Sequence, residues 1–295
     1  MNKNHNSLPI APLFVPGNRQ DMLNKVINMD VEWVIPDLED SVPLSEKEYA
    51  RDITKKSIIN LINSGKKIIP RINSFSTSYF LDDLESIIID GISGISIGKI
   101  QNVEEILKIS ELITIYENKK NIPNQSIGLL PWIENAEAVI NSFSIFKSSS
   151  RILWSAFGAE DFCADMDILK SDDIEENTND NNLLFARSNV SIAARAAGVH
   201  FLDTPYTSYK DQKGLSLDIK KAKSLGYKGK FAIHPSQVEV ISKLFRYSDK
   251  EILWAEKILL IVKNAEKNGV GAIGIDGKMI DAPVVKRAKN ILDLN

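Results

Sequence analysis

Cysteine and histidine are scarce in this sequence of 295 residues, which contains one cysteine and three histidines. The single cysteine, Cys163, excludes a disulfide framework and a cysteine-rich zinc site, and it favours a reducing, cytoplasmic location. Long apolar runs are missing as well, since none approaches the roughly 20 residues needed to span a bilayer. We therefore expect no membrane association.

An excess of positive charge is also absent. The chain has 36 lysines and arginines against 39 aspartates and glutamates, a formal charge of −3, so it offers no basic footprint for a nucleic acid. Arginine supplies only 8 of the 36 basic residues, which makes an arginine at the end of a predicted strand notable. The content of 43% hydrophobic and 25% charged residues is that of an ordinary globular protein.

What the sequence does contain is a regular alternation of short apolar runs with longer amphipathic segments, such as the stripe Met22, Val26 and Met29. Near-continuous apolar strands separated by helices indicate a parallel sheet buried on both faces. About eight such units predict an α/β fold, a (β/α)8 TIM barrel, although periodicity leaves an open doubly wound sheet as the alternative. The predicted strands are Leu13–Val15, Trp33–Ile35, Lys67–Ile72, Ile92–Ile97, Ile127–Ile133, Ile152–Phe157, Val199–Leu202 and Gly229–Ile233.

Two segments depart from this alternation. Ser171–Asn182 is polar, acidic and poor in apolar residues, which predicts a loop after the sixth strand. The C-terminal part combines an amphipathic helix, the glycine-rich segment Gly269–Pro283 and a final helix. We therefore predict a barrel over residues 10–245 and a C-terminal helical extension over residues 246–295 that packs on the barrel and reaches a neighbouring subunit.

Charged or polar residues follow nearly every predicted strand. The active site of a (β/α)8 barrel lies at the carboxyl ends of its strands, so these residues would gather at one rim. Any one of them could simply mark the point where solvent begins, but the set as a whole indicates a site. The rim residues include Arg19, Asp37, Glu39, Asp40, Arg71, Lys99, Glu134, Asp161, Asp203, Tyr206 and His234.

Glu134 and Asp161 follow successive strands and have no histidine or cysteine partner nearby in the sequence. Two carboxylates without soft ligands suit a hard cation, above all Mg²⁺, whereas a proton-transfer pair is the competing interpretation. Asp37, Glu39 and Asp40 could orient metal-bound waters, or could merely complement a helix dipole.

Basic residues at the predicted rim could bind an anionic ligand. Arg71 is suited to a bidentate clamp on a carboxylate or enolate. Lys99 would add positive charge, unless it is a surface residue, and His234 would position a loop or a ligand. Ser96 stands in a G-x-S-x-G pattern, but it lies between isoleucines inside an apolar run, so we predict a strand interior and no nucleophile.

Seven short motifs occur in order along the chain. They are LFVPGNR, DLEDSVP, RIN, IEN, FGAED, IHPSQ and DGKMIDAPVVKRA. Together, from about Leu13 to the C-terminus, they resemble the citrate lyase β-subunit-like acyl-CoA lyase family of the HpcH/HpaI aldolase/citrate lyase superfamily.

The resemblance implies a (β/α)8 barrel that assembles as a homotrimer or hexamer and uses Mg²⁺ to cleave or form a carbon–carbon bond between an acyl-thioester enolate and a 2-oxo acid. It implies that Glu134 and Asp161 hold the metal, and that Arg71 binds the oxo-acid oxygen. It also implies that Asp281 is an acid/base group reaching a neighbouring subunit. Glu39 and Asp40 complete the candidate catalytic set, and Arg19, Lys99 and His234 the candidate substrate contacts.

The resemblance leaves the substrate open. We expect a CoA thioester such as citramalyl-CoA or malyl-CoA. The alternatives are a citrate lyase β-subunit, whose substrate is carried on an acyl carrier protein in a multi-subunit complex, and a non-catalytic acyl-CoA-binding paralogue. Pro36, Gly98 and Asn135 depart from common residues of the family, and the first two alter loop geometry near the site.

Overall fold

A computed structural model describes residues 8–169, 183–267, 273–275 and 278–293. The predicted loop Ser171–Asn182 and part of the segment Gly269–Pro283 lie outside these residues. The strands and helices follow one another in the order β1 (Leu13–Pro16), α1 (Gln20–Val26), β2 (Trp33–Asp37), α2 (Lys47–Asn63), β3 (Lys67–Ile68), β4 (Arg71–Ile72), α3 (Phe80–Ile87), β5 (Gly94–Ile97), α4 (Val103–Lys119), β6 (Gly128–Ile133), α5 (Ala136–Lys147), β7 (Trp154–Phe157), α6 (Ala159–Asp165), α7 (Leu184–Ala197), β8 (His200–Asp203), α8 (Gln212–Ser224), β9 (Gly229–Lys230), α9 (Pro235–Phe245), α10 (Asp249–Lys267), β10 (Ile273–Ile275), β11 (Lys278–Ile280) and α11 (Ala282–Asp293).

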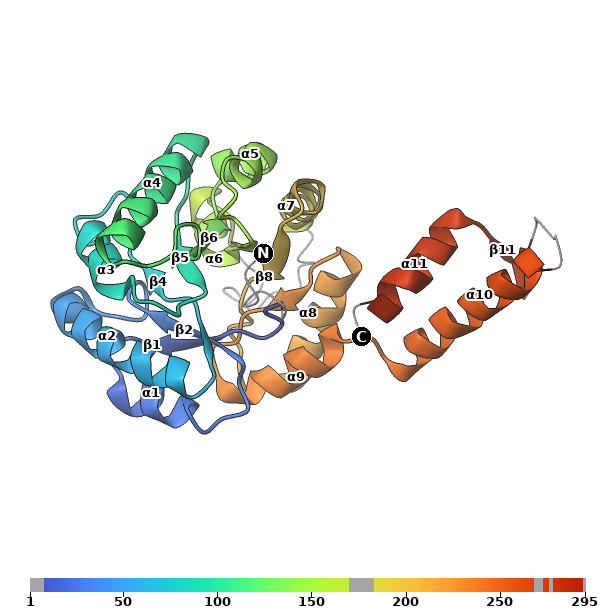
Figure 1. The fold of residues 1–295 in the computed structure, drawn as a ribbon, viewed down its shortest axis with the longest axis horizontal. Coiled ribbons are helices and arrows are strands. Elements are labelled where there is room, and N and C mark those ends of the chain that lie inside the picture. The colour runs from blue at the N-terminus through green and yellow to red at the C-terminus, as the bar shows by residue number, and fades with distance from the viewer. Residues whose placement is uncertain (1–7, 170–182, 268–272, 276–277, 294–295) are drawn as a thin grey trace. The chain divides into compact units, whose positions relative to one another are not determined.

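The strands from β1 to β9 form one parallel sheet that curls as in a TIM barrel, with helices around it (Figure 1). Neighbours pair in chain order, and the short strands β3 and β4 together occupy the third position, beside β2. The first and last positions also meet, because Phe14 N donates to Ala232 O and Ala232 N donates to Pro12 O, both at 2.9 Å. The predicted α/β class is confirmed, and each predicted strand contains part of this sheet.

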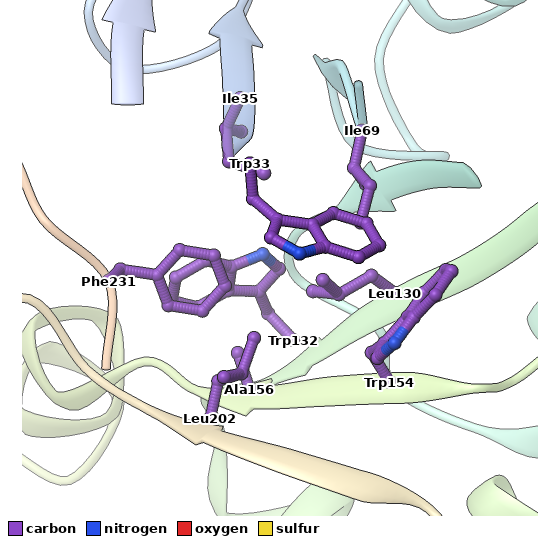
Figure 2. Close-up of a cluster of buried hydrophobic side chains, with 9 residues drawn as sticks. All are labelled: Trp33, Ile35, Ile69, Leu130, Trp132, Trp154, Ala156, Leu202 and Phe231. Atoms are coloured by element: carbon purple, nitrogen blue, oxygen red, sulfur yellow. The ribbon is translucent and has the colours of Figure 1, made fainter. Parts of the chain in front are cut away.

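The centre of the curled sheet is filled by aromatic and branched side chains (Figure 2). They come from alternate positions of the strands, as the two-residue period of a strand requires. Trp33 and Ile35 come from β2, Leu130 and Trp132 from β6, and Trp154 from β7, where its ring meets that of Trp33 at 5.5 Å. These side chains fill the interior of the curled sheet, so a site can form only where the strands end.

One predicted helix face is wrong in detail. Helix α1 ends at Val26, so Met29 lies beyond it, and it buries Leu23 and Val26 while Met22 remains 37% exposed. The buried face of the helix therefore begins at Leu23, one residue after the predicted Met22. Pro36 is accommodated inside the buried strand β2, where it lies opposite Val15 of β1.

The C-terminal residues form a second compact unit that begins at Lys243, three residues before the predicted start of the extension. Helices α10 and α11 pack around Ala255, Ile258, Ile280 and Ala288, and β10 pairs antiparallel with β11. Within the described residues, no helix combines the length and the apolar character that crossing a membrane would require.

Candidate active site

The segment after β2 carries the acidic residues of the site and is folded around Asp37. This carboxylate accepts hydrogen bonds from the backbone N–H of Glu39 at 2.9 Å and of Ser41 at 3.1 Å. The ammonium of Lys47 holds the same segment from the other side, donating to the carbonyl oxygens of Leu38 and Glu39 at 2.7 Å each. These contacts fix the backbone from which Glu39 and Asp40 extend.

Arg71, the first residue of β4, is bound to this acidic segment. Its Nε and Nη2 donate to the two carboxylate oxygens of Asp37 at 2.6 Å each. Its Nη1 lies 3.0 Å from Asp40 Oδ2 and 3.3 Å from Glu39 Oε2, and the guanidinium stacks 4.8 Å from the ring centre of Phe14. The bidentate clamp that the sequence predicts for a ligand is thus made with Asp37, and only Nη1 faces Glu39 and Asp40.

Glu134 follows β6 in a slot between two glycines. A Cβ atom on Gly158 would lie 2.7 Å from Cβ of Glu134, and a Cβ on Gly98 would lie 2.9 Å from its Oε1. Oε1 also accepts a hydrogen bond from the backbone N–H of Lys99. The Glu134 residue is only 5% exposed, so its carboxylate is fixed by backbone on both sides.

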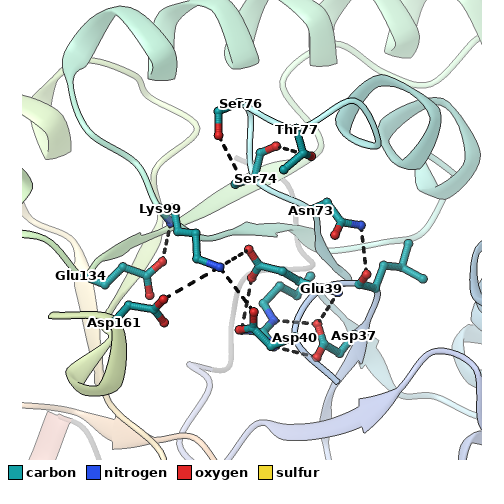
Figure 3. A network of polar contacts seen from close by, with 12 residues as sticks. Asp37, Glu39, Asp40, Asn73, Ser74, Ser76, Thr77, Lys99, Glu134 and Asp161 are labelled. Carbon is teal, nitrogen blue, oxygen red and sulfur yellow. Dashed lines mark hydrogen bonds and ion pairs between the residues drawn. The ribbon is translucent and has the colours of Figure 1, made fainter. Parts of the chain in front are cut away.

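The side chain of Lys99 links Glu39 and Asp40 to Asp161 at the start of α6 (Figure 3). Its Nζ lies 3.4 Å from Glu39 Oε1, 3.4 Å from Asp40 Oδ1 and 3.8 Å from Asp161 Oδ1. Carboxylates that follow β2 and β7 therefore share one ammonium.

Burial and mutual repulsion shift the acidity of these groups. Burial, together with the charges of Asp161 and Glu39, raises the pKa of Glu134 to about 8. Burial also raises the pKa of Glu39 to about 7, against the attraction of Arg71. Asp37 shows the opposite result, because Arg71 outweighs burial and lowers its pKa. Burial therefore disfavours the charged forms of Glu134 and Glu39, and a nearby cation would favour them.

A cavity of about 390 Å³ opens beside these residues, and its lining is acidic. Of the described residues that line it, Arg71 is the one lysine or arginine, and its bidentate edge is already occupied by Asp37. Phe14, Trp132, Pro205 and Ile233 provide apolar surface. The acidic lining residues are Asp37, Asp40, Glu134, Glu160 and Asp161.

The donor set fits a magnesium ion. Within the described residues, His, Cys, Asp and Glu side chains form no group of three that could hold a metal ion, so the fit rests on the two carboxylates of Glu134 and Asp161. Mg²⁺ is usually bound by one or two carboxylates and completes its coordination with waters and substrate oxygens. The high pKa of Glu134 reflects its burial first and the negative charge of Asp161 second, and a divalent cation would offset both.

Residues 11–235 match the family described as HpcH/HpaI aldolase/citrate lyase. The chain belongs to this family. The resemblance predicted from the seven motifs is confirmed, and with it the prediction of a lyase.

Two relatives show the range of this family. The citrate lyase subunit beta of Leuconostoc mesenteroides subsp. cremoris is 31% identical over 291 residues, which cover 99% of this chain and 94% of the relative. The mitochondrial citramalyl-CoA lyase of Rattus norvegicus is 28% identical over 302 residues, covering 99% of this chain and 87% of that protein.

Solved structures share the fold. The CitE protein of Mycobacterium tuberculosis, in complex with magnesium, acetoacetate and coenzyme A, superposes with a TM-score of 0.79 at 24% identity and covers 98% of each chain. A citrate lyase from Burkholderia xenovorans LB400 reaches a TM-score of 0.83 at 19% identity, covering 97% of this chain and 91% of that one.

Within this HpcH/HpaI fold, the structure brings together six of the nine predicted site residues: Glu39, Asp40, Arg71, Lys99, Glu134 and Asp161. Arg19 and His234 lie outside this network. Arg19 is exposed and pairs with Asp21 at 3.0 Å, and His234 stacks on Tyr209 with ring centres 4.9 Å apart. Asp281 belongs to the C-terminal unit, where its Oδ1 accepts from Val284 N at 3.2 Å and so caps α11.

Sequence reasoning missed several residues that hold the site in place. Lys47 gives no signal in the sequence, because a lysine in the first turn of a helix is usually at the surface. Asn73 donates to the carbonyl of Leu38 at 2.9 Å, and Asp83 accepts from the N–H of Asn73 at 3.0 Å. Ser96, by contrast, is buried in β5 and accepts from Trp132 Nε1 at 2.8 Å, which confirms the predicted strand interior.

Proposed function

We propose that this chain is a Mg²⁺-dependent carbon–carbon lyase that cleaves or forms a CoA thioester of a 3-hydroxy acid, such as citramalyl-CoA or malyl-CoA. The products of cleavage would be an acyl-CoA and a 2-oxo acid. The observation that carries this proposal is the convergence of Glu134, Asp161 and Arg71 on one cavity. Arg71 begins β4, Glu134 follows β6 and Asp161 lies beyond β7, in a fold whose named relatives are lyases.

Glu134 and Asp161 would hold the metal. When bound, Mg²⁺ would polarise the carboxylate and hydroxyl oxygens of the hydroxy acid and lower the pKa of the hydroxyl group. Glu39 and Asp40, which approach Arg71 and Lys99, would orient the waters around it. An anionic substrate could enter this acidic cavity only after such a cation had compensated the lining carboxylates.

Arg71 would stabilise the negative charge of the oxo-acid oxygen. Its Nη1 is the part of the guanidinium that points toward Glu39 and Asp40, whereas Asp37 holds the other edge in a fixed orientation. A charge held in place in advance stabilises a developing anion without reorganisation. Lys99 would add positive charge, and Arg19 and His234, which follow β1 and β9, would contact the remainder of the thioester.

In the direction of cleavage, a base removes the proton of the substrate hydroxyl, the carbon–carbon bond breaks, and its electron pair remains on the thioester as an enolate. Asp281 of a neighbouring subunit would then protonate the enolate carbon. In the direction of synthesis, the same carboxylate would remove a proton from the acyl methyl group. This role requires an oligomer, a homotrimer or hexamer, in which the segment from residue 246 onward packs on its own and a neighbouring closed (β/α)8 barrel of residues 10–245.

A citrate lyase β-subunit acting on a thioester of an acyl carrier protein is the second candidate. It is favoured by the identity of 30–31% to four relatives of that name, against 28% to the rat citramalyl-CoA lyase. A non-catalytic acyl-CoA-binding protein is disfavoured, because Glu134, Asp161 and Arg71 are all present around the cavity.

The test is to incubate the purified protein with citramalyl-CoA, malyl-CoA and citryl-CoA, with Mg²⁺ and with a chelator, and to measure the 2-oxo acid released. We expect Mg²⁺-dependent release from a free CoA thioester. A parallel incubation uses a citryl thioester of an acyl carrier protein, and release from this substrate alone would favour the second candidate. No turnover of any thioester would revive the non-catalytic alternative.

A further inference from the structure

The backbone of Lys99 adopts a conformation that is uncommon for a residue with a side chain. Its φ of +59° lies in the left-handed region, which glycine enters freely and lysine rarely. In this conformation the backbone N–H of Lys99 points at Glu134 and donates a hydrogen bond to its Oε1. The same residue thus fixes a proposed metal ligand with its backbone and extends its ammonium toward a second one.

The ammonium of Lys99 is shared between carboxylates and closely bound to none. Its distances of 3.4, 3.4 and 3.8 Å to Glu39, Asp40 and Asp161 exceed the roughly 2.7–2.9 Å of a good charge-assisted hydrogen bond (Figure 3). The side chain is 43% exposed. Arg71 and Lys47 differ, since their donors lie 2.6–2.7 Å from Asp37 and from backbone carbonyls.

This difference separates a fixed cation from a displaceable one. If Arg71 moved away, the carboxylate of Asp37, whose side chain is only 1% exposed, would stay buried without its counter-ion. Lys99 can leave at small cost, because its long side chain reaches solvent and its contacts are long. When it leaves, however, Glu39, Asp40 and Asp161 lose a shared counter-ion, so a departing ammonium has to be replaced by another cation.

We propose that Lys99 is a built-in competitor for the metal: its ammonium neutralises Glu39, Asp40 and Asp161 in the metal-free protein, and Mg²⁺ must displace it. This inference rests on the proposed function only for the site of Mg²⁺ at Glu134 and Asp161. It assigns Lys99 a positioning role in which its N–H keeps Glu134 in place throughout, while its side chain sets the metal affinity and is freed for an anionic substrate as the metal enters.

The experiment is a calorimetric titration of Mg²⁺ into the full chain, without substrate, for the wild type and for Lys99→Met. Methionine is unbranched like lysine and one atom shorter, and it keeps the backbone N–H but removes the charge. We expect Lys99→Met to bind Mg²⁺ about tenfold more tightly, the effect of removing roughly 1.4 kcal/mol of competition. We expect Lys99→Arg, which keeps the charge, to bind within a few-fold of the wild type.

A matched control is Lys119→Met on α4, which removes the same charge from an exposed lysine paired with Glu85 at 2.7 Å. It should leave the affinity for Mg²⁺ unchanged. Melting in a chelator gives a second readout, in which Lys99→Met melts below the wild type and gains more than the wild type when Mg²⁺ is added. Equal or weaker binding by Lys99→Met would overturn the inference and leave the proposed function intact, whereas a wild type that binds no Mg²⁺ would overturn both.

Discussion

Arg71 and Asp37 are joined by two parallel hydrogen bonds of 2.6 Å each, between the last residue of β2 and the first residue of β4. The two strands are neighbours, and Asp37 lies opposite Arg71 in their register. The pair therefore orients the guanidinium before any ligand binds. A charged pair that is almost fully enclosed in this way depends on both members, because removal of one leaves the other buried without its partner.

Asp37→Asn should consequently destabilise the protein by about 3 kcal/mol, since Arg71 keeps its charge but loses that of its principal counter-ion. Urea unfolding monitored by circular dichroism measures this loss. Asp21→Asn is the matched control, because Asp21 pairs with Arg19 in a similar two-bond arrangement at the surface. The control should unfold at nearly the same urea concentration as the wild type, and equal losses for the two variants would contradict the role given to Asp37.

Gly158→Ala should weaken Mg²⁺ binding by about tenfold or more, because the new methyl group would lie 2.7 Å from Cβ of Glu134 and push this proposed ligand out of its slot. The φ of Gly158 is −101°, so the substitution acts through this contact and not through backbone strain. Calorimetric titration with Mg²⁺ measures the effect.

Gly65→Ala provides the comparison for Gly158. Gly65 has a φ of +84°, and an alanine Cβ at this position would meet no neighbouring atom within 4 Å, so alanine strains the backbone without touching the site. It should cost about 1 kcal/mol of stability and leave the metal affinity unchanged. If Gly158→Ala binds Mg²⁺ as the wild type does, the glycine slot is not what fixes Glu134.

The residues at the rim of the site could be predicted from the sequence because of how parallel strands are arranged. Parallel strands end at one edge of a sheet, so the residues at or after the end of each apolar run, such as Asp37, Arg71, Glu134 and Asp161, had to lie on the same side. The strands themselves were predictable because they are buried on both faces and read as uninterrupted apolar runs.

Contacts between distant residues could not be predicted in the same way. The pairing of Arg71 with Asp37 depends on the register of two strands 34 positions apart, and a single sequence does not record register. The glycines that flank Glu134 look like any loop glycines until their approach to its carboxylate is seen. Lys47 is buried by carbonyl groups of an irregular segment, which has no periodicity to reveal it.

Glu134→Gln should change how stability depends on pH in the absence of metal. Burial raises the pKa of Glu134 from its ordinary 4.5 to about 8, so the folded state holds a proton that the unfolded state releases earlier. The stability of the wild type should therefore fall as the pH rises from about 4.5 through about 8, and glutamine removes this contribution. Melting temperatures between pH 5 and pH 9, a range that brackets the shift to about 8, measure the difference.

The same shift predicts that Mg²⁺ binding by the wild type strengthens by up to about tenfold per pH unit below pH 8, because the metal must displace a proton. Glu111→Gln, an exposed position on α4, should reproduce the wild-type profile. In the metal-free melting experiment, a dependence of melting temperature on pH that is the same for Glu134→Gln and the wild type would show that Glu134 is ionised in the metal-free protein.

Asp161→Asn should abolish Mg²⁺-dependent turnover, to below about 1% of the wild-type rate, while the fold survives, because a neutral amide binds a hard cation far more weakly than a carboxylate. Turnover at saturating Mg²⁺ and the melting temperature test both parts of this statement. Asp167→Asn is a close control: it removes a carboxylate six residues further on, at a φ of +54° that asparagine tolerates. Unchanged turnover with Asp161→Asn would remove Asp161 from the metal site.

Asp281→Asn separates two roles of one carboxylate. Asn is as good a helix cap as Asp, so the contact with Val284 N and the start of α11 should persist, whereas the acid/base function is lost. The variants Asp281→Asn and Arg71→Ala should each be inactive alone. If Asp281 serves the site of a neighbouring subunit, unfolding both variants, mixing them and refolding the mixture should restore activity. In a closed ring assembled at random from equal amounts, about a quarter of the sites would combine an intact Arg71 with an intact Asp281. Activity that stays at the level of the separate variants would mean that both residues must come from one chain, and would remove the requirement for an oligomer from the proposed reaction.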